Sequence, residues 1–345
     1  MLFHVGSLWR LADAGYLPKL DRISSVSGGS ITAAVLAVAW PELDFEPAGS
    51  ARNFEALIVR RLRDFAHRTV DVPAVLVGAL TPGLTVNGQL ARSYSRLLGG
   101  LTLADLPERP EFVFDATSLQ SGDLWRFSRD VQGDWRVGTE RRPATPLTRV
   151  VAASSAFPPI LSPARFSLPE GALEPGADSE VSRPPYTRRI VLSDGGVYDN
   201  LGLEAVWSRY TQVLISDAGG HMGNATRPHS FWPLSVLRVL SVVDNQVRDL
   251  RKRQAVQSFI DGHRTGAYWG IRSHVRDFQL TDPILEPTDA AVSALAGVAT
   301  RLAGIDDQLQ ERLINWGYAI CDTALRAHVD SAMPTGELPY PAAGI

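Results

Sequence analysis

The sequence is poor in the residues that mark disulfide-bonded, metal-binding and membrane-spanning proteins. Cys321 is its only cysteine, which excludes an internal disulfide and a Cys-x-x-Cys metal site. No apolar run approaches the roughly 18 residues that a membrane span needs. Neither a His-Glu-x-x-His motif, nor a phosphate-binding loop, nor a Gly-x-Gly-x-x-Gly after a strand is present, so we expect no metal and no nucleotide cofactor.

Strong charge is missing as well. The formal net charge is −3 over 345 residues, which gives no broad attraction to nucleic acid. The N-terminal residues carry no recognisable secretory signal, so we expect a cytoplasmic location, with peripheral attachment to a membrane as an option. The length fits one large α/β domain with a C-terminal extension, or two packed lobes.

The most informative motif is Ser25-Val26-Ser27-Gly28-Gly29. It lies between a short strand, 22–26, and an almost wholly apolar helix, 29–40. A serine at a sharp strand-to-helix turn needs small neighbours, and the turn would present Ser27 Oγ beside the positive end of the helix. This is the Gly-x-Ser-x-Gly pattern of a nucleophile elbow, with Ser25 in place of the first glycine. In an ordinary turn the same cluster would only cap the helix through Ser30.

A second motif places an aspartate at the end of a buried strand. Asp194 follows the apolar run 190–192, and Gly195 and Gly196 then permit a tight turn and a close backbone approach. An aspartate held there can take the proton of a serine hydroxyl as a general base. Alternatively, it only caps the N–H groups of its own turn. Asp217 ends the next buried strand, 211–216, and is a rival base.

Together, the two motifs resemble the patatin-like phospholipase family. Segment 151–159, with its small residues and prolines, is similar to the family's segment between the two motifs, and the resemblance covers about residues 1–220. It implies a lipid acyl hydrolase that acts through an acyl-enzyme on a phospholipid or another lipid ester. By matching motifs, Ser27 is the nucleophile, Asp194 is the general base of a Ser–Asp dyad, and the Gly28 N–H contributes to the oxyanion hole.

Helix and strand signals alternate along the chain as a doubly wound sheet requires, and the resemblance implies the same fold. We expect a three-layer α/β/α domain with a mainly parallel central sheet over 1–220, and a mostly helical extension, 221–345, packed on it. Family members carry a strand and a glycine-rich oxyanion loop before their first helix. The sequence begins inside the helix 2–15 instead, so we expect a catalytic domain that is truncated at its N-terminus.

Three alternatives stay open at this point. A Ser, Asp, His chain order would suit a triad with His221 or His263, whereas the resemblance implies a dyad without histidine. The same dyad could serve an acyltransferase. A non-catalytic lipid-binding or interaction protein would also account for a missing oxyanion loop. The basic cluster 248–253 either contacts anionic headgroups or is a solvated helix face, and no protein partner is indicated.

Overall fold

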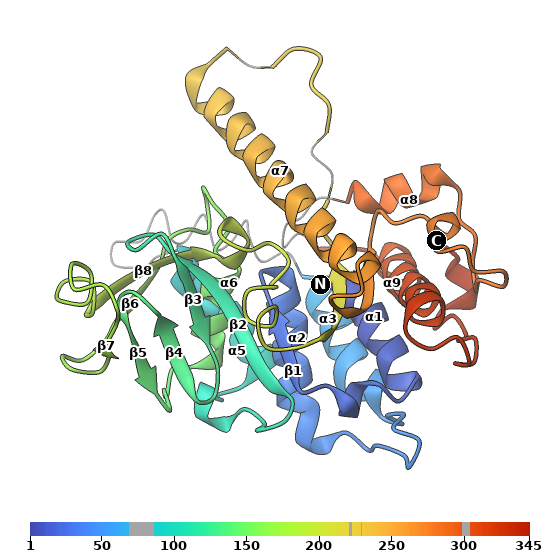
Figure 1. The fold of residues 1–345 in the computed structure, drawn as a ribbon, viewed down its shortest axis with the longest axis horizontal. Coiled ribbons are helices and arrows are strands. Elements are labelled where there is room, and N and C mark those ends of the chain that lie inside the picture. The colour runs from blue at the N-terminus through green and yellow to red at the C-terminus, as the bar shows by residue number, and fades with distance from the viewer. Residues whose placement is uncertain (69–85, 221–222, 229, 299–303) are drawn as a thin grey trace.

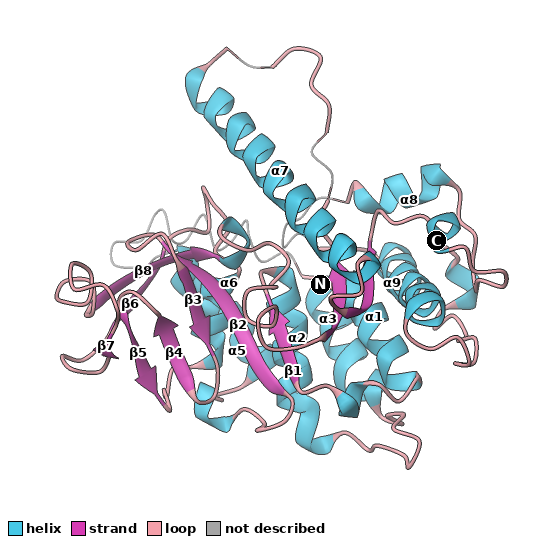
Figure 2. Ribbon diagram, viewed as in Figure 1, coloured by secondary structure: helices cyan, strands magenta, loops and turns pink. Residues whose placement is uncertain are grey.

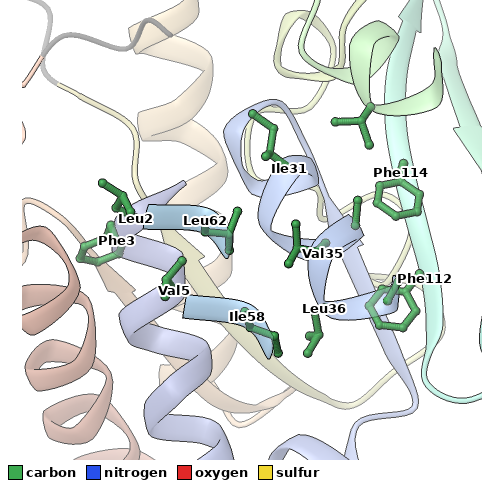
Figure 3. Close-up of a cluster of buried hydrophobic side chains, with 14 of the residues drawn as sticks. Leu2, Phe3, Val5, Ile31, Val35, Leu36, Ile58, Leu62, Phe112 and Phe114 are labelled. Atoms are coloured by element: carbon green, nitrogen blue, oxygen red, sulfur yellow. The ribbon is translucent and has the colours of Figure 1, made fainter. Parts of the chain in front are cut away.

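The computed structural model describes all residues except 69–85, 221–222, 229 and 299–303 (Figure 1). The first three elements match those predicted from the sequence. Helix α1 (Leu2–Asp13) is followed by strand β1 (Arg22–Ser25) and helix α2 (Gly28–Ala39). Helix α2 has almost no polar side chain, and it is buried between α1 and the sheet (Figure 3). The strand, turn and apolar helix predicted around Ser27 are therefore confirmed as secondary structure.

The other helices and strands follow one another in groups along the chain (Figure 2). The helices are α3 (Arg60–Ala66), α5 (Val86–Leu98), α6 (Leu147–Ser154), α7 (Trp232–Ile260), α8 (Asp289–Ala296) and α9 (Asp307–His328). The strands are β2 (Glu111–Ser118), β3 (Leu124–Phe127), β4 (Val131–Asp134), β5 (Gly138–Arg141), β6 (Ala164–Ser167), β7 (Glu174–Pro175), β8 (Arg189–Asp194), β9 (Gln212–Asp217) and β10 (Thr265–Gly270).

The prediction of a mainly parallel central sheet is wrong. The eight-stranded sheet has the order β6-β8-β2-β3-β4-β5-β7, with β1 paired to β2, and it is strongly curled into a half-barrel. Only the β1–β2 pairing is parallel, and every other pairing in it is antiparallel. The reason is the short connections from β2 to β5, because strands joined by tight turns run in opposite directions. A separate parallel pair, β9–β10, lies outside this sheet.

Helices from both ends of the chain share one core. Helix α9 crosses α1 so closely that a Cβ on Gly317 would lie 1.9 Å from Phe3 O, and one on Gly6 would lie 1.9 Å from Ile314 O. Only glycine fits at these two crossing points. Helix α6 lies against β2 and β8 as well as α2 and α5, so it links the elbow helix to the strand that ends at Asp194. No helix among the described residues combines the length and the apolarity needed to cross a membrane.

Candidate active site

Ser27 occupies the turn between β1 and α2 with a backbone conformation that is unusual for a residue other than glycine. Its φ is 51° and its ψ is −124°, and such a conformation costs on the order of 1–3 kcal/mol unless the surroundings impose it. One restraint is on α6, since the Ser27 N–H donates to Ser154 O at 3.2 Å. The side chain is half-buried rather than sealed in the core. Part of Ser27 is therefore exposed at the surface.

A network of buried serine side chains connects the turn to β2 and α6. Ser25 Oγ donates to Val113 O at 3.2 Å, and Ser30 Oγ lies 3.1 Å from Ser25 Oγ and 2.8 Å from Ser154 Oγ. Ser154 Oγ donates to Asp115 O at 2.6 Å. The serine in place of the first glycine of the elbow pattern thus ties the elbow to β2. Ser30 belongs to the same network and does not cap α2.

Asp194 lies at the end of β8, within reach of Ser27. Its N–H donates to Ala156 O at 2.9 Å, and its Oδ1 accepts from the Gly196 N–H at 2.8 Å. Its Oδ2 is buried and has no hydrogen-bond partner of ordinary geometry among the described residues. Ser27 is nevertheless close enough for a side-chain hydrogen bond to lower the pKa of Asp194.

The environment of Asp194 raises the pKa of its carboxyl. Burial raises the pKa of this carboxyl to about 6, against the lowering by hydrogen bonds from Ser27 and Gly196, and the nearby charge of Asp244 adds to the rise. A carboxyl with a pKa near 6 is ionised at neutral pH and is still basic enough to accept a proton. The group therefore suits a general base better than an exposed aspartate would.

Gly195 brings the two motifs together. A Cβ at this position would lie 2.3 Å from Asp115 O and 2.4 Å from Val26 Cγ1. Val26 is the residue before Ser27, and Asp115 belongs to the strand between β1 and β8. The absence of a side chain thus lets the Asp194 turn lie directly against the elbow, as the predicted close approach required.

The rival base has other neighbours. Asp217 Oδ2 accepts from the Tyr268 hydroxyl at 2.7 Å, and its Oδ1 accepts from the Gly219 N–H at 2.7 Å. Among the proposed histidines, His263 is exposed in the turn between α7 and β10, and His221 lies outside the described residues. Within the described part of the chain, no group of three or more His, Cys, Asp or Glu is arranged to hold a metal ion.

Several residues around the site were not found from the sequence. The Tyr94 hydroxyl, on α5, lies 3.1 Å from Ser155 Oγ, and burial raises the pKa of Tyr94, with Asp194 adding to the rise. Asp244, on α7, accepts through its backbone O from the Asn200 side chain at 3.4 Å. No local pattern marks these residues, because they reach the site only through the packing of helices distant in sequence.

The position of Gly28 fits the predicted oxyanion donor. Its N–H opens α2, and the first N–H groups of a helix have no acceptor within the helix. The next two groups are used in the turn, since Gly29 donates to Val26 O and Ser30 donates to Ser27 O, each at 2.9 Å. A partial positive charge at this helix end adds to the attraction for an anion.

Comparison with known proteins gives one family. The sequence model of the patatin-like phospholipases matches residues 1–207, which is more than half of the chain and includes the elbow, the α6 segment and the Asp194 turn. No curated protein matches the sequence. The chain therefore belongs to the patatin-like phospholipases, a family of lipid acyl hydrolases that act on lipid esters.

Proposed function

We propose that the protein hydrolyses lipid esters with a Ser27–Asp194 dyad, through an acyl-enzyme. The observation that carries the proposal is the geometry at the two turns. Ser27 is strained and half-buried, and it lies close enough to the buried Asp194 carboxyl to lower its pKa. The second oxygen of this carboxyl has no ordinary hydrogen-bond partner among the described residues. Oδ1 of Asp194 already caps its own turn by accepting from the Gly196 N–H. Capping therefore leaves the buried Oδ2 without a role.

The proposed reaction has two halves. Ser27 Oγ attacks the acyl carbonyl while Asp194 takes the hydroxyl proton, and the oxyanion of the tetrahedral intermediate is held by the Gly28 N–H and the helix end. The C–O ester bond then breaks, the alcohol leaves with the proton from Asp194, and the acyl group stays on Ser27. Water attacks this ester with Asp194 again as base, which releases the fatty acid and restores the serine.

The surroundings of the dyad suit an apolar substrate. Phe157 and Ile160 follow α6, and Val197 follows the Asp194 turn; all three are exposed. Phe157 comes directly after Ala156, whose O accepts from the Asp194 N–H. Large apolar side chains exposed near a carboxylate favour the binding of esters with long acyl chains over esters that are soluble in water.

Hydrolysis of nitrophenyl esters and of mixed phospholipid vesicles tests the proposal. We expect turnover of both by the wild type, and none above background by Ser27→Ala or Asp194→Asn. Asp217→Asn is the matched control, because it removes the same charge from a similar turn, and we expect it to keep turnover within a few-fold. Equal activity of the wild type and Ser27→Ala would contradict the proposal.

Product analysis separates the two remaining alternatives. If an acceptor alcohol such as glycerol takes most of the acyl groups in place of water, the same dyad serves an acyltransferase. If neither ester is cleaved while the protein still binds vesicles, the protein is a lipid-binding relative. The dyad chemistry would then be wrong.

A further inference from the structure

The N-terminal half of α7 stands away from the rest of the protein (Figure 1). From Asp244 onwards the helix is mostly half-buried, because its second half packs on β10. Before Asp244, the segment 231–243, which we name the projecting segment, is exposed at nearly every described side chain. Its large apolar side chains are each at least 39% exposed: Phe231, Trp232, Leu234, Val236, Leu237, Val239, Leu240, Val242 and Val243.

These apolar residues surround the helix instead of forming a stripe. At about 100° per residue, Trp232, Val236 and Val239 fall on one side, while Leu234 and Leu237 fall on the opposite side. A helix that pairs with a second copy needs one apolar stripe with polar flanks. A helix that is apolar all round needs an apolar environment all round. Lipid provides such an environment at the end of a projecting helix, whereas a single partner helix does not.

The charge of this region fits an anionic lipid surface. No aspartate or glutamate occurs between Asp217 and Asp244, although the chain has 37 acidic residues. Arg227 and Arg238 lie in the same stretch, and Arg238 donates to Gly223 O at 2.7 Å. Arg238 is six residues from Trp232, or about 9 Å along the helix. That distance matches the roughly 5–10 Å to which interfacial helices enter a bilayer.

The projecting segment ends near Asp194. Asp244, where the segment meets the body, lies near enough to Asp194 to contribute to its raised pKa. The Asp244 backbone O accepts from Asn200, six residues after Asp194. Docking through the projecting segment would therefore hold Asp194 and its turn at a fixed distance from the lipid layer.

We propose that the projecting segment docks the protein on an anionic lipid surface. Its first two turns, with Phe231, Trp232 and Leu237, enter the outer hydrocarbon of one leaflet, and Arg238 reaches the headgroup phosphates. The segment is about 18 Å long, so it reaches into a single leaflet and does not span the bilayer. This docking needs no chemistry at Ser27.

Vesicle flotation with the Ser27→Ala protein tests the docking without hydrolysis. We expect flotation with vesicles of phosphatidylglycerol and phosphatidylcholine. Trp232→Glu and Leu234→Glu should each lower the partition coefficient roughly tenfold or more, because each places a charge where an apolar side chain enters lipid. Ile260→Glu is the matched control: Ile260 is 71% exposed against 72% for Trp232, and it lies at the other end of the same helix. It should change the partition less than twofold.

Further results test the docking and its alternatives. Arg238→Gln should weaken binding to anionic vesicles and leave the weaker binding to pure phosphatidylcholine unchanged. Equal flotation of Trp232→Glu and Ile260→Glu, with unchanged melting temperatures, would overturn the docking. A dimer that light scattering detects in the wild type and that Trp232→Glu dissociates would also overturn the docking, because a second copy would then occupy the segment. If the wild type hydrolyses a soluble nitrophenyl ester but the protein does not float with vesicles, the docking is wrong and the proposed function stands. If the protein floats but the wild type hydrolyses no ester, the docking stands and the proposed function is wrong.

Discussion

Two strand ends in this protein have nearly the same sequence and differ in what they can do. Segment 191–196 reads Val-Leu-Ser-Asp-Gly-Gly, and segment 214–219 reads Leu-Ile-Ser-Asp-Ala-Gly. Both aspartates end a buried strand, and each accepts from the N–H two residues on, at 2.8 Å for Asp194 and 2.7 Å for Asp217. The local sequence therefore produces the same turn twice.

The second carboxylate oxygen separates the two turns. In Asp217 it accepts from the Tyr268 hydroxyl, a contact that anchors β10 to β9. In Asp194 it is buried and has no ordinary hydrogen-bond partner among the described residues, and the carboxyl is close enough to Ser27 for the serine to lower its pKa. An aspartate that holds a tyrosine stabilises the fold, whereas one left partly unsatisfied is available for proton transfer. Tertiary neighbours, not the motif, decide which role each turn takes.

The largest expected difference is in turnover. Asp194→Asn should lower kcat/KM for a nitrophenyl ester by about 10²–10⁴-fold, the range over which a general base contributes. Asp217→Asn should stay within a few-fold of the wild type. Steady-state kinetics on the two purified variants measures the ratio directly. Equal losses would mean that the comparison assigns the wrong role to one of the two turns.

The dependence of turnover on pH should follow Asp194. Because burial raises its pKa to about 6, the base is ionised above pH 6 and protonated below it. We expect kcat/KM to fall about tenfold per pH unit below pH 6 and to be level at neutral pH. A profile measured from pH 4 to 8 checks this. Asp217→Asn should leave the inflection in place, and an inflection near 4 would contradict the raised pKa.

Substitution by alanine should destabilise the protein more at Gly195 than at Gly219. At Gly195 a Cβ would collide with the Asp115 backbone, whereas the second turn has Ala218 directly after its aspartate. At Gly219 the nearest atoms to a Cβ belong to the end of the Arg248 side chain, which can move. Gly195→Ala should lower the free energy of unfolding by about 2–3 kcal/mol, and Gly219→Ala by less than about 1 kcal/mol. Chemical denaturation of both variants is the test; similar losses would count against the close approach.

The removal of the Asp194 charge should stabilise the protein at neutral pH. The folded-state pKa is raised above the usual 3.8 to about 6, so the carboxyl's favourable contribution is complete below pH 4 and is lost as the pH rises through 6. Asp194→Asn does not titrate, and it should gain about 3 kcal/mol over the wild type at pH 8. The gain should vanish near pH 4. Urea unfolding at the two pH values measures it, and a loss of stability at pH 8 would refute the account.

The smallest expected effect concerns the structural turn. Tyr268→Phe removes the hydroxyl that Asp217 Oδ2 accepts, so it should cost about 1 kcal/mol of stability and leave kcat/KM unchanged. Thermal melts and ester kinetics on this one variant are sufficient. A tenfold loss of turnover without a change in stability would indicate that the β9–β10 turn takes part in catalysis after all.

The sequence was informative where structure is local. The elbow at Ser27 and the turn after Asp194 depend on a few adjacent small residues, and both were predicted. The direction of the sheet was not predicted. The alternating helix and strand signals and the resemblance both favoured a parallel sheet, whereas the short turns from β2 to β5 impose antiparallel pairing. Tyr94 and Asp244 also escaped prediction, since only the packing of α5 and α7 brings them near Asp194.

The most direct test of the central claim is the rate at which a fluorophosphonate modifies Ser27, followed by mass spectrometry of the labelled peptide. The account predicts fast labelling of the wild type and of Asp217→Asn, and labelling at least a hundredfold slower in Asp194→Asn. Fast labelling of Asp194→Asn together with slow labelling of Asp217→Asn would show that the wrong aspartate has been paired with the serine.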